Sequence, residues 1–143
     1  MKIEKDSAMY GVQNVEYILD QAQEIKKRAT DIGFDVNNSP EKAYQKIKEE
    51  YDELGEELEV YSKNNSQENL LKIKKELGDV FFALCALCNK LNLSAKETLE
   101  LTNEKFVFRN FYVEKKLKEQ NLDFKTASLD QMCKLWQEAK KVK

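Results

Sequence analysis

Two pairs of acidic residues are the part of this sequence best suited to chemistry. Glu50 and Glu53 form one pair, Glu76 and Asp79 form the other, and 22 residues separate the pairs. Because residues three apart lie on one side of a helix, each pair would present two carboxylates together. If two helices bring the pairs into contact, each close carboxylate pair costs about 4 kcal/mol at roughly 4 Å and an effective dielectric constant near 20. The pattern therefore predicts a bound cation, and all-oxygen ligands suit Mg²⁺ or Mn²⁺.

Glu50 occupies a place that an apolar residue would otherwise fill. It lies three residues after Ile47 and four before Leu54, within the apolar stripe of a helix. An ionised carboxylate is expensive to bury there unless it is paired or binds a metal. The second acidic pair directly precedes residues 80–88, which are apolar all round and therefore predicted to lie in the interior. The alternative is a solvated face, and the residues alone favour neither explanation over the other.

Positive charge is concentrated further along the chain. Lys105 and Arg109 are one helical turn apart and follow Asn103 closely. Two cations presented together would suit a phosphate chain that is bridged to metal ions on its other side. By themselves they are more typical of a solvated basic face. Cys85 and Cys88 form a lone CxxC within an apolar segment, which is more typical of small buried side chains than of a zinc or redox site.

Composition excludes several other kinds of chemistry. The sequence has no histidine, which excludes Ser-His-Asp triads and histidine-ligated zinc. With 24 basic and 26 acidic residues well mixed, no basic field predicts nucleic-acid binding. The longest apolar run has nine residues, too short for a membrane span, and the charged N-terminal segment does not resemble a signal peptide. Three cysteines without export signals predict a cytoplasmic protein.

The elements that must position these residues are predicted to be helices. One proline and four glycines in 143 residues disfavour an all-β fold, which needs many turns. Apolar residues at three- and four-residue spacing predict a first helix over residues 12–32, ended by Gly33. Ser39 with Pro40 begins a second helix that extends to about Lys63, and residues 64–66 begin a third. Ser94 with Glu97 and Ser128 with Gln131 form capping boxes for a fourth helix to about Gln120 and a short last helix around Trp136.

Short connections between these helices predict an all-α antiparallel bundle of four main helices and a short C-terminal helix, in a single domain over residues 1–143. We expect it to be completed by dimerisation, because apolar surface remains. The second helix is predicted to bury Ala43, Ile47, Leu54, Leu58 and Tyr61. The third is predicted to bury Leu70, Ile73, Leu77, Val80, Leu84, Leu87 and Leu91.

The acidic pairs and the segments around them resemble the MazG-type nucleoside triphosphate pyrophosphohydrolases, in the all-α NTP pyrophosphatase superfamily. The likeness lies in an ExxE pair, a spacer and an ExxD pair, with similar surroundings at residues 46–50, 76–83 and 103–109. Residues 28–35 and 135–140 are similar to the C-terminal domain of two-domain MazG proteins. The resemblance covers roughly residues 28–141.

The resemblance implies a Mg²⁺-dependent hydrolase, with Mn²⁺ as a substitute, that converts a nucleoside triphosphate or its deoxy form to the monophosphate and pyrophosphate. It also implies a homodimer or a dimer of dimers, and a task in clearing the nucleotide pool. The metal ligands would be Glu50, Glu53, Glu76 and Asp79. The catalytic carboxylates would be Glu49, Glu50 and Glu53, with Glu49 as a general base or as an outer partner of the ligands. Substrate would contact Lys46, Asn103, Lys105 and Arg109.

Two alternatives remain open at this point. One is a narrower enzyme of the same superfamily, such as a dUTPase, a dCTPase or a phosphoribosyl-ATP pyrophosphatase. The other is a non-enzymatic acidic helical module that binds divalent cations or a partner helix. A panel of nucleotides assayed with Mg²⁺ would distinguish the enzymes from one another and from the module.

Overall fold

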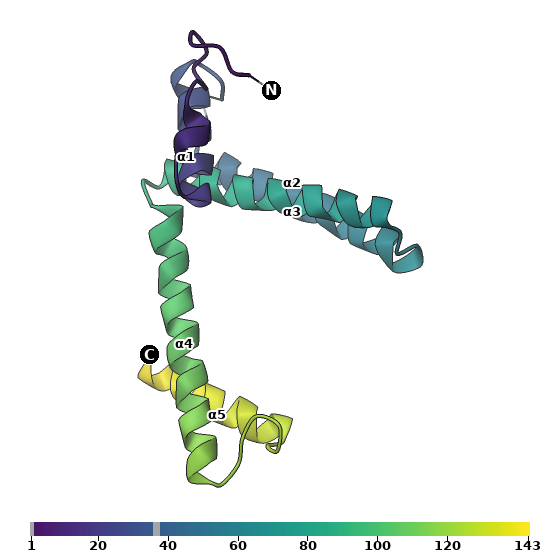
Figure 1. Ribbon diagram of the computed structural model, residues 1–143, viewed down its shortest axis with the longest axis vertical. Helices are drawn as coiled ribbons and strands as arrows, with labels where there is room; N and C mark the ends of the chain where they lie inside the picture. Colours follow the sequence, from purple (N-terminus) through teal and green to yellow (C-terminus); the bar gives the residue numbers. More distant parts are fainter. Residues whose placement is uncertain (1, 36–37) are drawn as a thin grey trace. The chain divides into compact units, whose positions relative to one another are not determined.

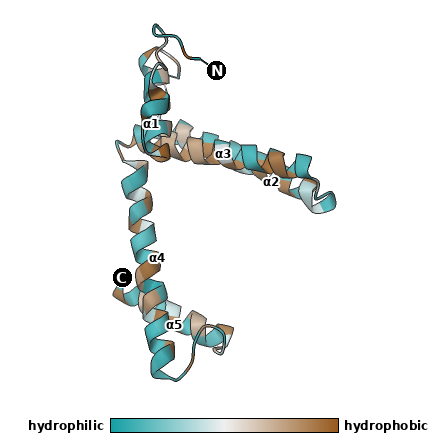
Figure 2. Cartoon of the chain, in the orientation of Figure 1, coloured by the Kyte–Doolittle hydropathy of each residue, from teal (hydrophilic) through white to brown (hydrophobic). Residues whose placement is uncertain are grey.

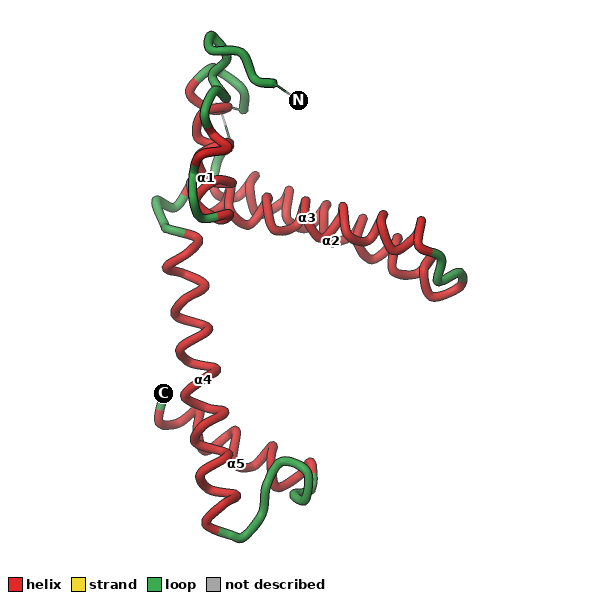
Figure 3. The backbone as a smooth tube through the Cα atoms, viewed as in Figure 1, coloured by secondary structure: helices red, strands yellow, loops and turns green. Residues whose placement is uncertain are grey.

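The computed structural model describes residues 2–35 and 38–143, and these residues form helices joined by short loops (Figures 1 and 3). No strand occurs in this part of the chain, so the all-α prediction is confirmed. In chain order the elements are η1 (Val12–Asn14), α1 (Ile18–Asp31), α2 (Pro40–Lys63), α3 (Gln67–Lys90), α4 (Ala95–Glu119) and α5 (Leu129–Val142).

The chain divides into two compact units, Met1–Lys96 and Glu97–Lys143. The first contains η1, α1, α2, α3 and the first residues of α4, and the second contains the rest of α4 with α5. The expectation of a single domain over residues 1–143 stays a prediction.

The predicted start of the first helix is wrong. Residues 12–14 form a single 3₁₀ turn instead, preceded by Gly11 in the left-handed region at φ 77°. Val15 and Tyr17 are extended, so helical hydrogen bonding begins only at Ile18. The predicted end is confirmed, because Gly33 follows the last turn at φ 100°, a conformation that suits glycine.

Side-chain caps explain where the other helices begin. The Ser39 hydroxyl accepts a hydrogen bond from the backbone N–H of Lys42, and Pro40 occupies the first helical position. Ser66 caps α3 in the same way. The predicted capping box of Ser128 and Gln131 is present with both of its hydrogen bonds, and α4 begins directly after Ser94, as expected.

The antiparallel pair α2 and α3 is the framework of the first unit (Figure 1). Three residues connect the two helices, and α1 packs against α3. On each helix, the residues that face the partner helix follow one another at alternating spacings of four and three residues. This spacing keeps them on one side of the helix, as packing of a helix pair requires. The inward positions of α2 are Ala43, Ile47, Glu50, Leu54, Glu57 and Tyr61. Those of α3 are Asn69, Ile73, Glu76, Val80 and Ala83.

The predicted stripes were therefore wrong in phase at several positions. On α2, Leu58 is exposed and Glu57 takes the inward place. Hydrophobic and hydrophilic residues alternate along α3 (Figure 2). The leucines at seven-residue spacing, three on α3 and one directly after it, are 42–48% exposed within this single chain, and their spacing places them on a second apolar face beside the inward one. These leucines are Leu70, Leu77, Leu84 and Leu91.

The apolar run at residues 80–88 is also not buried all round. Ala83, Cys85 and Ala86 are buried, whereas Phe81 is 61% exposed. The reason is that α1 and α2 together cover only part of the circumference of α3.

Among the described residues no single helix is long and apolar enough to cross a membrane. The two helices α3 and α4, which a short connection separates, have the length and composition to do so only when they are taken together.

The second unit has a small apolar core of its own. Val113 and Leu117 of α4 are almost completely buried and pack with Leu135 of α5. The rings of Phe106 and Trp136 lie 5.2 Å apart, in a tilted arrangement that favours aromatic contact.

Replacement of Leu117 by Ala should strongly lower the free energy of unfolding of the second unit. Leu117 is 0% exposed, and a buried Leu→Ala change costs about 2–5 kcal/mol because it leaves a cavity. Urea unfolding followed by circular dichroism would measure the loss. The matched change Leu129→Ala, at a side chain that is 71% exposed, should alter the free energy of unfolding by less than about 1 kcal/mol. Equal losses in both variants would contradict this description of the core.

Candidate functional site

Glu50 is the buried member of the first acidic pair. Only 8% of the residue is exposed, because α2 turns it toward α3 between Ile47 and Leu54. The expectation that Glu50 fills a place in the stripe is confirmed, and the alternative that it reaches solvent is wrong. Its carboxylate has one cationic partner, the Lys46 ammonium at 2.6 Å, one turn earlier on α2. The hydrogen bond to Glu50 is the main cause that raises the pKa of Lys46.

Glu76 faces Glu50 from the opposite helix. It lies on the inward stripe of α3, and one of its carboxylate oxygens, Oε2, is buried without a hydrogen-bond partner among the described residues. Burial is the main cause that raises the pKa of Glu76, and the negative charges of Glu53, Asp79, Glu50 and Glu57 raise it further. An acceptor oxygen without a donor, surrounded by other carboxylates, is destabilising unless a cation satisfies it.

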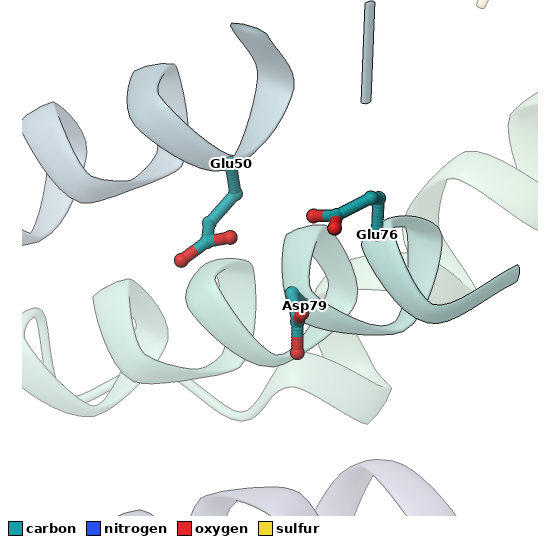
Figure 4. Close-up of side chains that lie close together, drawn as sticks. All are labelled: Glu50, Glu76 and Asp79. Carbon is teal, nitrogen blue, oxygen red and sulfur yellow. The ribbon is translucent and has the colours of Figure 1, made fainter. Parts of the chain in front are cut away.

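The carboxylates of Glu50, Glu76 and Asp79 converge between α2 and α3 (Figure 4). One oxygen from each lies within 4.8 Å of the others, and the carboxylate of Glu76 points toward Glu50 in the close-up. Three hard oxygen donors at this spacing fit a divalent cation such as Mg²⁺ or Mn²⁺, which prefers oxygen ligands. The unpartnered oxygen of Glu76 supports the same interpretation.

Glu53, the fourth predicted ligand, is placed differently. It is exposed and does not belong to the group of three whose oxygens lie within 4.8 Å. Its negative charge nevertheless raises the pKa of Glu76, as the charges of Asp79 and Glu50 do. Its role as a ligand stays a prediction.

Sequence reasoning missed Glu57. This glutamate is half-buried on the inward stripe, and its charge also raises the pKa of Glu76. A signal was available, since Glu57 follows Glu50 by seven residues and therefore lies on the same helix face. The neighbouring Leu58 was predicted to lie in the inward stripe instead, because it is apolar.

A cleft of about 550 Å³ adjoins the carboxylates, and Glu50 and Asp79 belong to its lining. Three lysines also line it: Lys26 from α1, and Lys42 and Lys46 from α2. A volume of this size falls within the range of small-molecule sites. The cleft therefore brings acidic groups suited to a cation and ammonium groups suited to an anion into one hollow.

Two of the predicted site residues lie at the edge of this cleft. Glu49 is exposed, and its carboxylate is 3.7 Å from the Lys46 ammonium. Lys46, predicted to contact substrate, is half exposed and pairs with Glu50. The structure therefore joins Glu49, Lys46 and Glu50 in one ion-pair group, with Lys46 at its centre.

The predicted residues of α4 belong to the second compact unit. Asn103 and Lys105 are exposed, and the Arg109 guanidinium donates from Nε to the carbonyl oxygen of Lys143 at 2.9 Å. Lys105 and Arg109 are one turn apart on α4, as expected. Because each unit is described by itself, their meeting with the carboxylates of the first unit stays a prediction.

The cysteine pair behaves as small apolar side chains. Cys85 is buried and Cys88 half-buried, neither forms a disulfide, and burial raises the pKa of both thiols. A raised pKa keeps a thiol protonated and unreactive, which agrees with the prediction that this CxxC is not a redox site.

Comparison with known proteins assigns the family. The model of the MazG nucleotide pyrophosphohydrolase domain matches residues 38–113, more than half of the 143 residues. The chain belongs to this family. The matched segment contains both acidic pairs and the residues from Asn103 to Arg109, which carried the predicted resemblance.

The relatives agree with this assignment to the MazG family. The nucleoside triphosphate pyrophosphohydrolases of Escherichia coli K12 and O157:H7 are each 31% identical to the chain over 121 residues, which is 85% of this chain and 44% of the relative. The uncharacterised protein YabN of Bacillus subtilis is 40% identical over 68 residues, which is 48% of this chain and 14% of that protein. The chain thus spans less than half the length of the E. coli relatives it matches.

Replacement of Glu76 by Gln should stabilise the metal-free protein at neutral pH. The raised pKa of Glu76 means that its ionised form is disfavoured in the folded state, and an amide removes that charge while adding donors for nearby carboxylates. In EDTA at pH 7 the Tm should rise, and the gain should shrink as the pH falls toward 4.5, the ordinary pKa of a glutamate.

The control is Glu56→Gln, at an exposed position in the middle of α2. It should leave the Tm nearly unchanged at every pH. A Glu76→Gln variant that is less stable than the unmodified protein in EDTA at pH 7 would contradict the description of a strained carboxylate cluster.

Proposed function

We propose that this chain is a Mg²⁺-dependent hydrolase that converts nucleoside or deoxynucleoside triphosphates to monophosphates and pyrophosphate. The observation that carries the proposal is the convergence of three carboxylates with one buried oxygen that lacks a partner. Membership of the MazG family, and the name of the E. coli relatives, supply the substrate class. The proposed role of this activity is the removal of unwanted nucleotides from the nucleotide pool.

The carboxylates of Glu50, Glu76 and Asp79 would hold the metal, and Glu53, whose charge also raises the pKa of Glu76, would join them. When bound, a divalent cation neutralises the acidic cluster, polarises phosphate oxygens and makes a water molecule more acidic. Glu49 is exposed beside this cluster and suits the acceptance of a proton from an attacking water molecule.

Lys46 would exchange partners when substrate enters. In the described state its ammonium lies 2.6 Å from Glu50 and 3.7 Å from Glu49. With a cation held at Glu50, Lys46 would no longer be needed to neutralise that carboxylate, and the half-exposed lysine would be available for a phosphate oxygen. Lys105, Arg109 and Asn103 of the second unit would contribute the remaining donors.

The exposed face of α3 supports a homodimer, or a dimer of dimers. Leu70, Leu77, Phe81 and Leu84 are 42–61% exposed and follow one another at helical spacing. A helix stripe of this kind is typical of contact with another helix, and a second copy of the chain offers the same stripe. The bundle predicted from the sequence would then be completed between two chains.

The hydrolase proposal is tested by a panel of ribo- and deoxyribonucleoside triphosphates with Mg²⁺, scored for release of monophosphate and pyrophosphate. Activity on several substrates is expected. Activity confined to dUTP, dCTP or phosphoribosyl-ATP would favour the narrower superfamily enzymes. No turnover of any nucleotide, with a Tm that Mg²⁺ leaves unchanged, would favour the interaction module and contradict the proposal.

The metal ligands give a sharper prediction. Asp79→Ala and Glu53→Ala should each lower kcat/KM by at least about 100-fold while the helical circular dichroism signal is retained, because they remove oxygens that would hold the cation. Asp52→Ala is the matched control, since Asp52 is exposed next to Glu53 but, unlike Glu53, is not among the charges that raise the pKa of Glu76. Full activity in the Asp79 variant would show that the metal site lies elsewhere.

Disruption of the α3 stripe tests the assembly. Phe81→Glu places a charge in the middle of the exposed apolar face and should produce a monomer in sedimentation-velocity experiments. The matched variant Tyr51→Glu, at a 68% exposed aromatic residue on α2, should leave the assembly unchanged. A Phe81→Glu variant that remains dimeric would contradict the proposed interface.

A further inference from the structure

The exposed aromatic ring of Phe34 is held in place by the end of α1. The backbone N–H of Phe34 donates to the carbonyl oxygen of Ala29 at 2.9 Å, and the N–H of Gly33 donates to Thr30 at 3.0 Å. These two hydrogen bonds form a Schellman motif, in which the residue at the position of Phe34 usually packs against the helix. Phe34 is instead 67% exposed, so its backbone is fixed while much of its ring faces solvent.

Lys26 fixes the same segment through its side chain. Its ammonium lies 5.4 Å from the centre of the Phe34 ring and 2.7 Å from the Asp35 carboxylate. The Lys26 side chain is only 12% exposed, and Asp35 has a left-handed φ of 65°. The Lys26 ammonium therefore lies against both the Phe34 ring and the carboxylate of the residue that follows it.

Phe34 lines the same cleft as Glu50 and Asp79. The cleft also has an apolar wall on α3, formed by Phe82, Ala83 and Ala86. A nucleotide has an acidic polyphosphate end and a flat, π-rich base, and this hollow of about 550 Å³ offers both kinds of surface. An exposed ring with a fixed backbone loses little conformational entropy when it stacks on a base.

We propose that Phe34 is the residue on which the nucleobase stacks, and that Lys26 is a positioning residue that holds its ring. The inference rests on the proposed function, because it assumes that the cleft takes a nucleotide whose phosphates lie at the carboxylates. Stacking uses the π-face that all bases share, so this contact accepts purines and pyrimidines alike. Selectivity among bases would come from other groups in the cleft.

The test is calorimetric binding of two non-hydrolysable nucleotides, the α,β-imido analogues of dATP and dUTP, to the full chain with Mg²⁺. Loss of a base–aromatic stack weakens binding by roughly 5- to 100-fold, so Phe34→Ala should raise the Kd of both analogues by at least about fivefold. Phe34→Trp should restore it. Binding of inorganic tripolyphosphate, which has no base, should change by less than about twofold in either variant.

Tyr44→Ala is the matched control, because Tyr44 is also an exposed aromatic residue with a lysine over its ring, Lys48 at 5.0 Å, but it does not line the cleft. It should leave every Kd unchanged. Lys26→Met should weaken nucleotide binding in the unmodified protein and add nothing in the Phe34→Ala variant, because Lys26 acts through the ring. An additive effect would show that Lys26 contacts the nucleotide directly and would overturn its positioning role.

An unchanged nucleotide Kd in Phe34→Ala would overturn the stacking proposal, as would equal weakening of tripolyphosphate or an equal effect of Tyr44→Ala. These outcomes are distinct from failure of the proposed function. An unmodified chain that binds the analogues through Phe34 but releases no monophosphate from any triphosphate would overturn the hydrolase and leave the base site standing. A chain that binds neither analogue would overturn both.

Discussion

The burial of carboxylates between α2 and α3 is the constraint on which the rest of the structure depends. Glu50 and Glu76 occupy inward positions of two packed helices, where apolar residues would give a more stable pair. Lys46 offsets part of the cost at Glu50, but one oxygen of Glu76 is buried without a hydrogen-bond partner among the described residues. Such a cluster lowers the stability of the fold, but it holds several negative charges at one fixed position. This is the pattern expected of a binding site that gains stability when a cation arrives.

The same helix pair explains why α3 has two faces. Its inward face includes small and polar residues, among them Glu76 and Ala83, which let α2 approach and leave room for the cleft. The large apolar residues, among them Phe81, lie on a neighbouring face that the first unit does not cover. The proposed metal site and the proposed dimer interface would thus lie on different sides of one helix, so that changes to one side need not disturb the other.

Much of this was predictable from the sequence, and the errors have physical causes. The helices, the caps at Ser39 and Ser128 and the burial of Glu50 follow from local patterns that act within a few residues. The side of α3 that faces α2 could not be predicted in this way. The leucines at seven-residue spacing have the pattern of an inward stripe, and periodicity alone does not show which partner a face contacts. The Lys26–Asp35 ion pair joins a helix to the loop after it, and no spacing rule indicated it.

The central claim is that Glu50, Glu76 and Asp79 hold a divalent cation between α2 and α3. The most direct measurement is anomalous X-ray scattering from crystals of the full chain grown with Mn²⁺. The account predicts an anomalous difference peak within about 2.5 Å of one carboxylate oxygen from each of these three residues, with Mg²⁺ competing for the same position. A peak elsewhere on the protein, with these carboxylates empty at saturating Mn²⁺, would contradict it.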